Sequence, residues 1–89
     1  MMKLTPPQKQ ILEKLIYPEP FSRVQEETGM DYGSLRDELM QLINHGFVEV
    51  FEQGDNPNRI LHLYDTDNLQ LFAFRATKRG LAGIKNIRL

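Results

Sequence analysis

The sequence predicts an α+β fold, three helices followed by a three-stranded antiparallel sheet, because its hydrophobic period changes from helical to extended near the middle of the chain. Before the change, Leu35, Leu39 and Leu42 recur at the spacing of one helix face. After it, residues 47–52 are rich in Val and Phe, which favour strands. A chain of 89 residues suits one domain with a small core, so we expect a single domain over residues 1–89.

The first helix is expected over residues 5–16. Thr5 is a favourable N-cap, Pro6 fits the first turn without losing a hydrogen bond, and Gln8 completes a capping-box pattern. The prolines within residues 17–20 end this helix, because proline cannot continue it. The same prolines lack amide donors, so any strand pairing in that segment should be minimal.

Two more helices are expected over residues 22–29 and 31–45. Ser22 opens a second capping-box pattern at the start of the shorter helix. Asp31 is placed to cap the longer helix by accepting a hydrogen bond from a free amide of its first turn. Gly46 can adopt the left-handed conformation that ends it.

Three strands are expected to form an antiparallel meander in chain order, over residues 47–52, 59–64 and 69–75. Turn residues separate them, including the Gly-, Asn- and Pro-containing loop at 53–58. Residues 76–89 are expected to form a basic C-terminal tail. Thr77 can cap a single helical turn there, whereas two closely spaced glycines disfavour a long final helix.

A helix that runs through residues 45–46 directly into a strand is preceded here by residues 26–30, which fit a helix end and a tight turn. This arrangement resembles the winged helix-turn-helix family of DNA-binding domains, over roughly residues 5–80. Residues 76–81 also resemble the turn that often closes such domains. The resemblance implies that the third helix enters the major groove of duplex DNA and that the loop at 53–58 is the wing.

The resemblance also implies nucleic-acid-binding residues on the third helix, beside the wing and at the basic end: Tyr32, Ser34, Arg36, Gln41, Arg59, Arg75, Lys78 and Arg79. Arg36 is the best base reader, because a guanidinium can bond guanine O6 and N7 together. The arginines and the lysine after the last strand would contact phosphates. Carboxylates on the third helix oppose this role, and its polar residues also fit an ordinary solvent-facing surface. The opposing carboxylates are Asp31, Asp37 and Glu38.

The formal net charge of −1 argues mildly against a nucleic-acid binder, which usually carries a basic footprint. The charge is unevenly distributed, however. Residues 1–46 contain more acidic than basic side chains, whereas residues 75–89 contain basic side chains and no acidic one. The basic end is therefore either a phosphate-binding surface or a solvated tail with an accidental bias.

Several classes of function are disfavoured by composition. The chain has no cysteine, which excludes a disulfide framework, and its two histidines lack the clustered ligands of a metal site. No nucleophile–histidine–acid set or glycine-rich phosphate loop is present, so we expect neither enzymatic activity nor a cofactor. No apolar run is long enough to span a membrane and the N-terminus lacks a signal-peptide core, so a cytoplasmic location is expected.

Two functions follow as expectations. The first is a small DNA-binding protein of the transcriptional-regulator type, with double-stranded DNA as partner. The alternative is a winged-helix domain that binds a protein partner or forms a homodimer without binding DNA. A homodimer or protein partner would use an aromatic-rich sheet, unless the rings only close the core. The aromatic residues concerned are Phe47, Phe51, Tyr64, Phe72 and Phe74.

Overall fold

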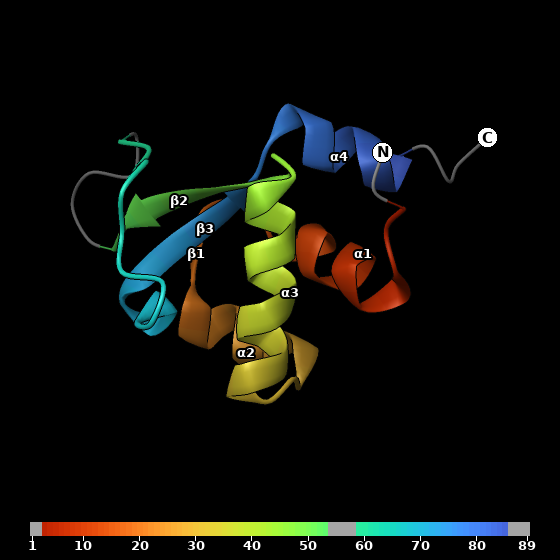
Figure 1. Ribbon diagram of the computed structural model, residues 1–89. Coiled ribbons are helices and arrows are strands. Elements are labelled where there is room, and N and C mark those ends of the chain that lie inside the picture. The colour runs from red at the N-terminus through yellow and green to blue at the C-terminus, as the bar shows by residue number, and fades with distance from the viewer. Residues whose placement is uncertain (1–2, 54–58, 86–89) are drawn as a thin grey trace.

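Four α-helices pack around one small antiparallel sheet in the computed structural model, which describes residues 3–53 and 59–85 (Figure 1). The α+β class and a three-stranded antiparallel sheet are as expected, but the number of helices and the residues that form the strands differ. In chain order the elements are α1 (Pro6–Glu13), β1 (Glu19–Pro20), α2 (Phe21–Thr28), α3 (Tyr32–Asn44), β2 (Val48–Glu52), the 3-10 turn η1 (Leu69–Leu71), β3 (Phe72–Ala76) and α4 (Lys78–Lys85).

The sheet is not the predicted meander, because its strand order is β1-β3-β2. The middle strand predicted over residues 59–64 does not form. Only Ile60 makes an isolated bridge to Phe51, and the Leu61 amide donates to the Val50 carbonyl at 2.8 Å. Strand β3 pairs with β2 on one side and with β1 on the other, so residues 59–64 have no free edge of β3 to join. The proline-limited pairing expected in residues 17–20 is confirmed, since β1 has two residues.

The capping box predicted at the start of α1 is confirmed. The Gln8 amide donates to Thr5 Oγ1 at 3.4 Å, and the Thr5 amide donates to Gln8 Oε1 at 3.0 Å. The capping box predicted at Ser22 is wrong, because α2 begins one residue earlier and its N-cap is Pro20, which has no side-chain cap bond. Whether a capping pattern is used therefore depends on the exact residue at which the helix begins.

The helix α3 lies within one residue of the predicted range at each end, but the capping hydrogen bond predicted for the Asp31 side chain is absent. Asp31 is still the N-cap, and Gly46 follows the helix with φ of 78°. Leu35, Leu39 and Leu42 are fully buried against the other helices and the sheet. This apolar stripe fixes which side of α3 faces solvent.

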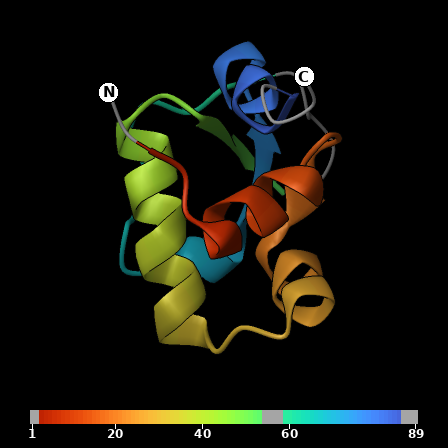
Figure 2. The ribbon, with the colours of Figure 1, turned by 90° about the vertical axis from the view of Figure 1, so that its right-hand side faces the viewer.

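Residues 78–85 form a two-turn helix, α4, instead of the predicted single turn in a basic tail; residues 86–89 lie outside the described range. The cap on Thr77 is as expected, since the Gly80 amide donates to Thr77 Oγ1 at 3.1 Å. A Cβ at Gly80 would collide with the Phe47 carbonyl oxygen and lie 3.1 Å from Leu12 Cδ2. Glycine therefore lets α4 pack closely over α1, and this packing outweighs its low helix propensity (Figure 2).

The aromatic side chains of the sheet region mainly close the core. Phe47, Phe51 and Phe74 are buried. Phe72 and Tyr64 are partly buried and meet edge to face, with ring centroids 5.9 Å apart. Burial also raises the pKa of the Tyr64 hydroxyl, because it disfavours the charged phenolate. These five rings thus form no exposed aromatic patch.

Candidate functional site

The solvent-facing side of α3 is the surface assigned to DNA by the resemblance. Ser34, Asp37, Gln41 and Asn44 are exposed there, opposite the buried leucine stripe. Every residue of α3 is described, and no lysine or arginine lies on this side. The only charge on the solvent-facing side is therefore the negative charge of Asp37.

Arg36, the predicted base reader, lies at the flank of α3 and is engaged within the protein. Its guanidinium is 3.3 Å from an Asp37 carboxylate oxygen and 3.8 Å from one of Asp67. One turn earlier, the Tyr32 hydroxyl donates to Gln70 Oε1 at 3.0 Å. The segment before β3 thus packs beside the N-terminal half of α3 and holds both predicted contact residues.

A local turn shapes this segment. Asp65 accepts hydrogen bonds from the Asp67 amide at 3.0 Å and from the Asn68 side chain at 2.6 Å. Because both bonds favour the ionised carboxylate, the pKa of Asp65 lies below its usual value. The turn presents the Asp67 carboxylate to Arg36.

Gln41 is drawn toward α1 by Gln8, whose side chain is only 2% exposed. Gln8 Nε2 donates to Gln41 Oε1 at 3.2 Å and to Glu38 Oε1 at 2.9 Å. The predicted nucleic-acid contact of Gln41 therefore competes with a contact between α1 and α3. The sequence pattern identified Gln8 only as a cap, because its partners on α3 lie thirty residues away.

The surface around α2 and the N-terminal half of α3 is acidic. Its one further arginine, Arg23, is paired with Glu27 at 2.8 Å, and this hydrogen bond raises the pKa of the guanidinium further. The carboxylates of this region are Glu26, Glu27, Asp31, Asp37, Glu38, Asp65 and Asp67. We call this region the acidic end.

The opposite end of the molecule, around α4, is basic. Lys78, Arg79 and Lys85 are exposed on α4, which contains no acidic residue. The Arg79 guanidinium lies 5.2 Å from the centroid of the Phe47 ring, a cation–π arrangement. Two of the predicted phosphate contacts, Lys78 and Arg79, therefore lie together on one helix.

The two remaining predicted residues, Arg75 and Arg59, lie elsewhere. Arg75 donates to Glu49 Oε2 through Nη2 at 2.9 Å and Nε at 3.2 Å, and its guanidinium covers the Phe51 ring. Arg59 is exposed at the end of the predicted wing. Residues 54–58 of that wing lie outside the described residues. The eight predicted residues thus occupy separate surfaces.

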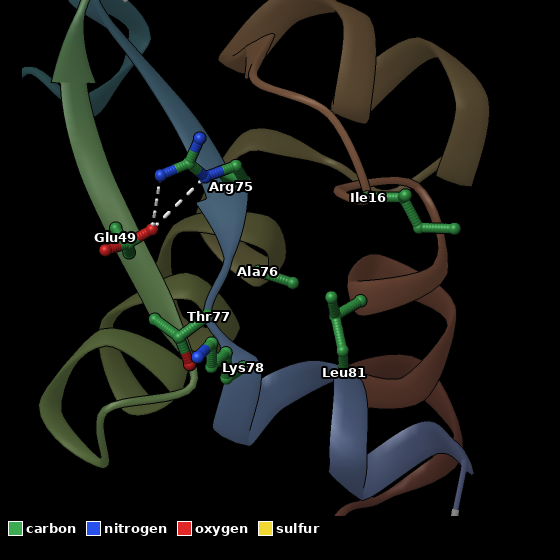
Figure 3. A pocket seen from close by; sticks show the side chains of 7 residues that line it. All are labelled: Ile16, Glu49, Arg75, Ala76, Thr77, Lys78 and Leu81. Atoms are coloured by element: carbon green, nitrogen blue, oxygen red, sulfur yellow. Dashed lines mark hydrogen bonds and ion pairs between the residues drawn. The ribbon is translucent and has the colours of Figure 1, made fainter. Parts of the chain in front are cut away.

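A cleft of about 470 Å³ opens between β3, α4 and the turn after α1 (Figure 3). Ile16, in the turn after α1, and Leu81, on α4, line its helical side, whereas Ala76 and the Arg75–Glu49 pair lie on the sheet. Lys78 lies at the edge formed by the start of α4. We call this feature the α4 cleft.

The sequence prediction missed the α4 cleft because it extended the first helix through residue 16. The helix ends at Glu13, which leaves Ile16 50% and Tyr17 74% exposed. The prolines at 18 and 20 set only the latest possible end of the helix; α1 ends three residues before the predicted end, with Lys14 as its C-cap.

Across residues 3–53 and 59–85, no three His, Asp or Glu side chains gather as a metal site would need. No helix in the same residues has both the length and the apolar character needed to cross a bilayer. The searches of known proteins add no relative: no protein-family model, curated protein or solved structure matches this chain significantly.

Proposed function

We propose that this chain is a winged-helix domain that serves as a protein-interaction module and does not read duplex DNA through α3. The order of elements supports the winged-helix assignment. Strand β1 stands between α1 and α2 and pairs with β3, where members of the family often hold a short extended segment beside the wing sheet. Fold alone does not decide between DNA and protein partners.

The observation that carries the proposal is the charge of the α3 surface. Affinity for DNA depends on lysine and arginine side chains that neutralise phosphates. The solvent-facing side of α3 contributes Asp37 and no cation, and Arg36 is held by Asp37 and Asp67. A duplex seated on α3 would also approach the carboxylates of the acidic end, which repel phosphate.

Fluorescence anisotropy with a labelled random-sequence duplex tests this proposal. We expect no saturable binding at about 50 mM salt, where electrostatic contacts are strongest. Gln41→Glu adds a negative charge to the solvent-facing side of α3 while keeping an acceptor for Gln8 Nε2. Gln10→Glu, on the exposed side of α1, adds the same charge elsewhere. Salt-sensitive binding that Gln41→Glu abolishes and Gln10→Glu preserves would overturn the proposal.

Regulator-type DNA binding is the second candidate, and the basic face of α4 favours it. Lys78, Arg79 and Lys85 can contact phosphates from one helix without using α3. In that case the protein binds the duplex, and Lys78→Gln lowers its affinity for the duplex whereas Gln41→Glu does not. The same titration therefore separates the two candidates.

A further inference from the structure

We propose that the α4 cleft is the docking site for an acidic, amphipathic segment of a partner protein. An apolar side chain of the partner packs against Ile16 and Leu81, and a carboxylate binds Lys78. This inference rests on the proposed function, because it names the partner chemistry of the interaction module.

The apolar part of the cleft explains the partner's apolar side chain. Ile16 is half exposed and Leu81 is partly buried, and both line the cleft together with the buried Ala76 of β3 (Figure 3). Tyr17, the next residue after Ile16, is also exposed. Covering this apolar surface with a partner side chain removes it from water and favours association.

The charges around the cleft favour a negatively charged partner. Glu49 is already bonded to two nitrogens of Arg75, and the third nitrogen points away from Glu49 (Figure 3). Lys78 adds a positive charge at the edge of the cleft. A partner carboxylate beside Lys78 gains a charge-assisted contact and does not have to displace Glu49 from Arg75.

The spacing on α4 indicates an amphipathic helix or extended segment as the occupant. One face of α4 carries residues at helical spacing, namely Lys78, Leu81 and Lys85. This face therefore presents an apolar side chain between two cations. The two lysines are about 10 Å apart along the helix axis, from a rise of about 1.5 Å per residue. A segment with two carboxylates at a similar separation and an apolar residue between them matches this face.

A nucleic-acid backbone fits the cleft less well than such a segment. Phosphates satisfy Lys78 but leave the apolar side chains of Ile16 and Leu81 without a partner. A second copy of this chain presents carboxylates at its acidic end, where the leucines of α3 are buried but Leu63 and Leu71 are 93% and 60% exposed. Self-association is therefore the competing occupant of the cleft, and sedimentation tests it. An acidic peptide with an exposed aliphatic residue supplies both contacts.

The test is a binding titration with a fluorescein-labelled synthetic peptide of Glu and Leu arranged with helical amphipathic period. Two control peptides are used: one has the same composition without the period, and one has Lys in place of Glu. We expect saturable binding of the acidic amphipathic peptide alone. Amide chemical-shift changes in a 15N-labelled sample should centre on Thr77–Leu81.

Matched variants locate the site. Ile16→Ser should lower the affinity for the acidic peptide about tenfold, because an apolar contact is lost. Leu63→Ser, at a side chain that is 93% exposed outside the cleft, should leave the affinity unchanged. Lys78→Gln should weaken it about threefold, as expected for a partly exposed ion pair. Lys14→Gln removes the same charge from the exposed end of α1 and should leave the affinity unchanged.

The docking inference is wrong if the acidic peptide does not bind, if the basic peptide binds equally, or if Lys14→Gln and Lys78→Gln act alike. It is also wrong if sedimentation shows self-association that occupies the cleft. A failure of this kind with no DNA binding removes the cleft assignment alone. DNA binding through α3, in contrast, removes the proposed function whatever the peptide does.

Discussion

The two ends of α3 are held by different kinds of contact. At its N-terminal end, exposed side chains tie it to the segment before β3, through Tyr32 with Gln70 and Arg36 with Asp67. At its C-terminal end the contacts are backbone hydrogen bonds and close packing. The Phe47 amide donates to the Leu42 carbonyl at 2.8 Å, and the Thr77 amide donates to the Phe47 carbonyl at 3.0 Å. Exposed polar contacts contribute little free energy, whereas close packing is costly to disturb.

This difference coincides with the charge pattern. The end that exposed bonds tie to the segment before β3 is the acidic end, and the end that backbone bonds join to α4 lies beside the α4 cleft. A binding surface is more precise on elements that are fixed by packing than on a segment held by exposed bonds. The proposed interaction surface at α4 therefore lies on the more firmly packed end, and four measurements test this contrast between the two ends.

The largest effect is expected at Gly80. Gly80→Ala should lower the free energy of unfolding by about 2–3 kcal/mol, because the added methyl collides with the Phe47 carbonyl and crowds Leu12. Gly33→Ala, in α3 with only an Asp31 oxygen 3.8 Å from the new methyl, should instead raise it by about 0.5–1 kcal/mol. Urea unfolding measures both. Equal effects would mean that α4 is not closely packed.

The next effect is expected at Thr77, which joins the C-terminal end of α3 to α4. Its hydroxyl donates to the Gly46 carbonyl at 2.7 Å and accepts from the Gly80 amide. Thr77→Val keeps the shape but removes both bonds, and should cost about 1–2 kcal/mol in thermal unfolding. Thr66→Val, in an exposed turn, is the matched control and should be nearly neutral. A neutral Thr77→Val would weaken the contrast between the two ends.

A smaller effect is expected at Tyr32. Tyr32→Phe removes the bond to Gln70 but keeps the ring packed 5.2 Å from Phe21. It should cost about 0.5 kcal/mol. The informative measurement is hydrogen exchange, which should become faster for the amides of η1 and stay unchanged in α4. Faster exchange in both places would show that the ends are coupled.

The smallest effect is expected from the titration of Asp65. Its pKa is lowered by the bonds from Asn68 and Asp67, so the unfolded chain holds this proton more tightly than the folded one. The stabilisation is present above the ordinary aspartate pKa of about 3.9 and is lost as pH falls through the lowered value. Asp65→Asn should reduce the loss of thermal stability on acidification below about pH 4. An unchanged pH profile would contradict this role of the turn.

The parts of the fold that local patterns determine could be predicted. The capping box at Thr5, the leucine stripe of α3 and the left-handed Gly46 depend on neighbours within a few residues. The parts that failed depend on distant partners. Apolar and polar residues alternate over residues 59–64 as in a strand. In the predicted meander this segment would pair with β3, but that edge of β3 pairs with β1, which lies forty residues earlier in the chain.

The candidate site could be predicted only as a set of residue types. The sequence identified the basic character of Lys78 and Arg79 correctly, but it gave no sign that Arg36 would be held by Asp67. It also treated the glycines of α4 as obstacles to a helix. Their use becomes apparent only when Phe47 and Leu12 are brought against Gly80. Long-range packing thus created the cleft from residues with no local signature.

The central position of β3 also constrains how the protein is made. Strands β1 and β2 never pair with each other, since each pairs only with β3 in the described sheet. During synthesis both must wait for residues 72–76 to emerge from the ribosome before either has its hydrogen-bonding partner. Helices can form earlier from local contacts, but the sheet is completed in one late step. A nascent chain stalled before β3 would therefore expose the apolar residues of β2 to chaperones and proteases.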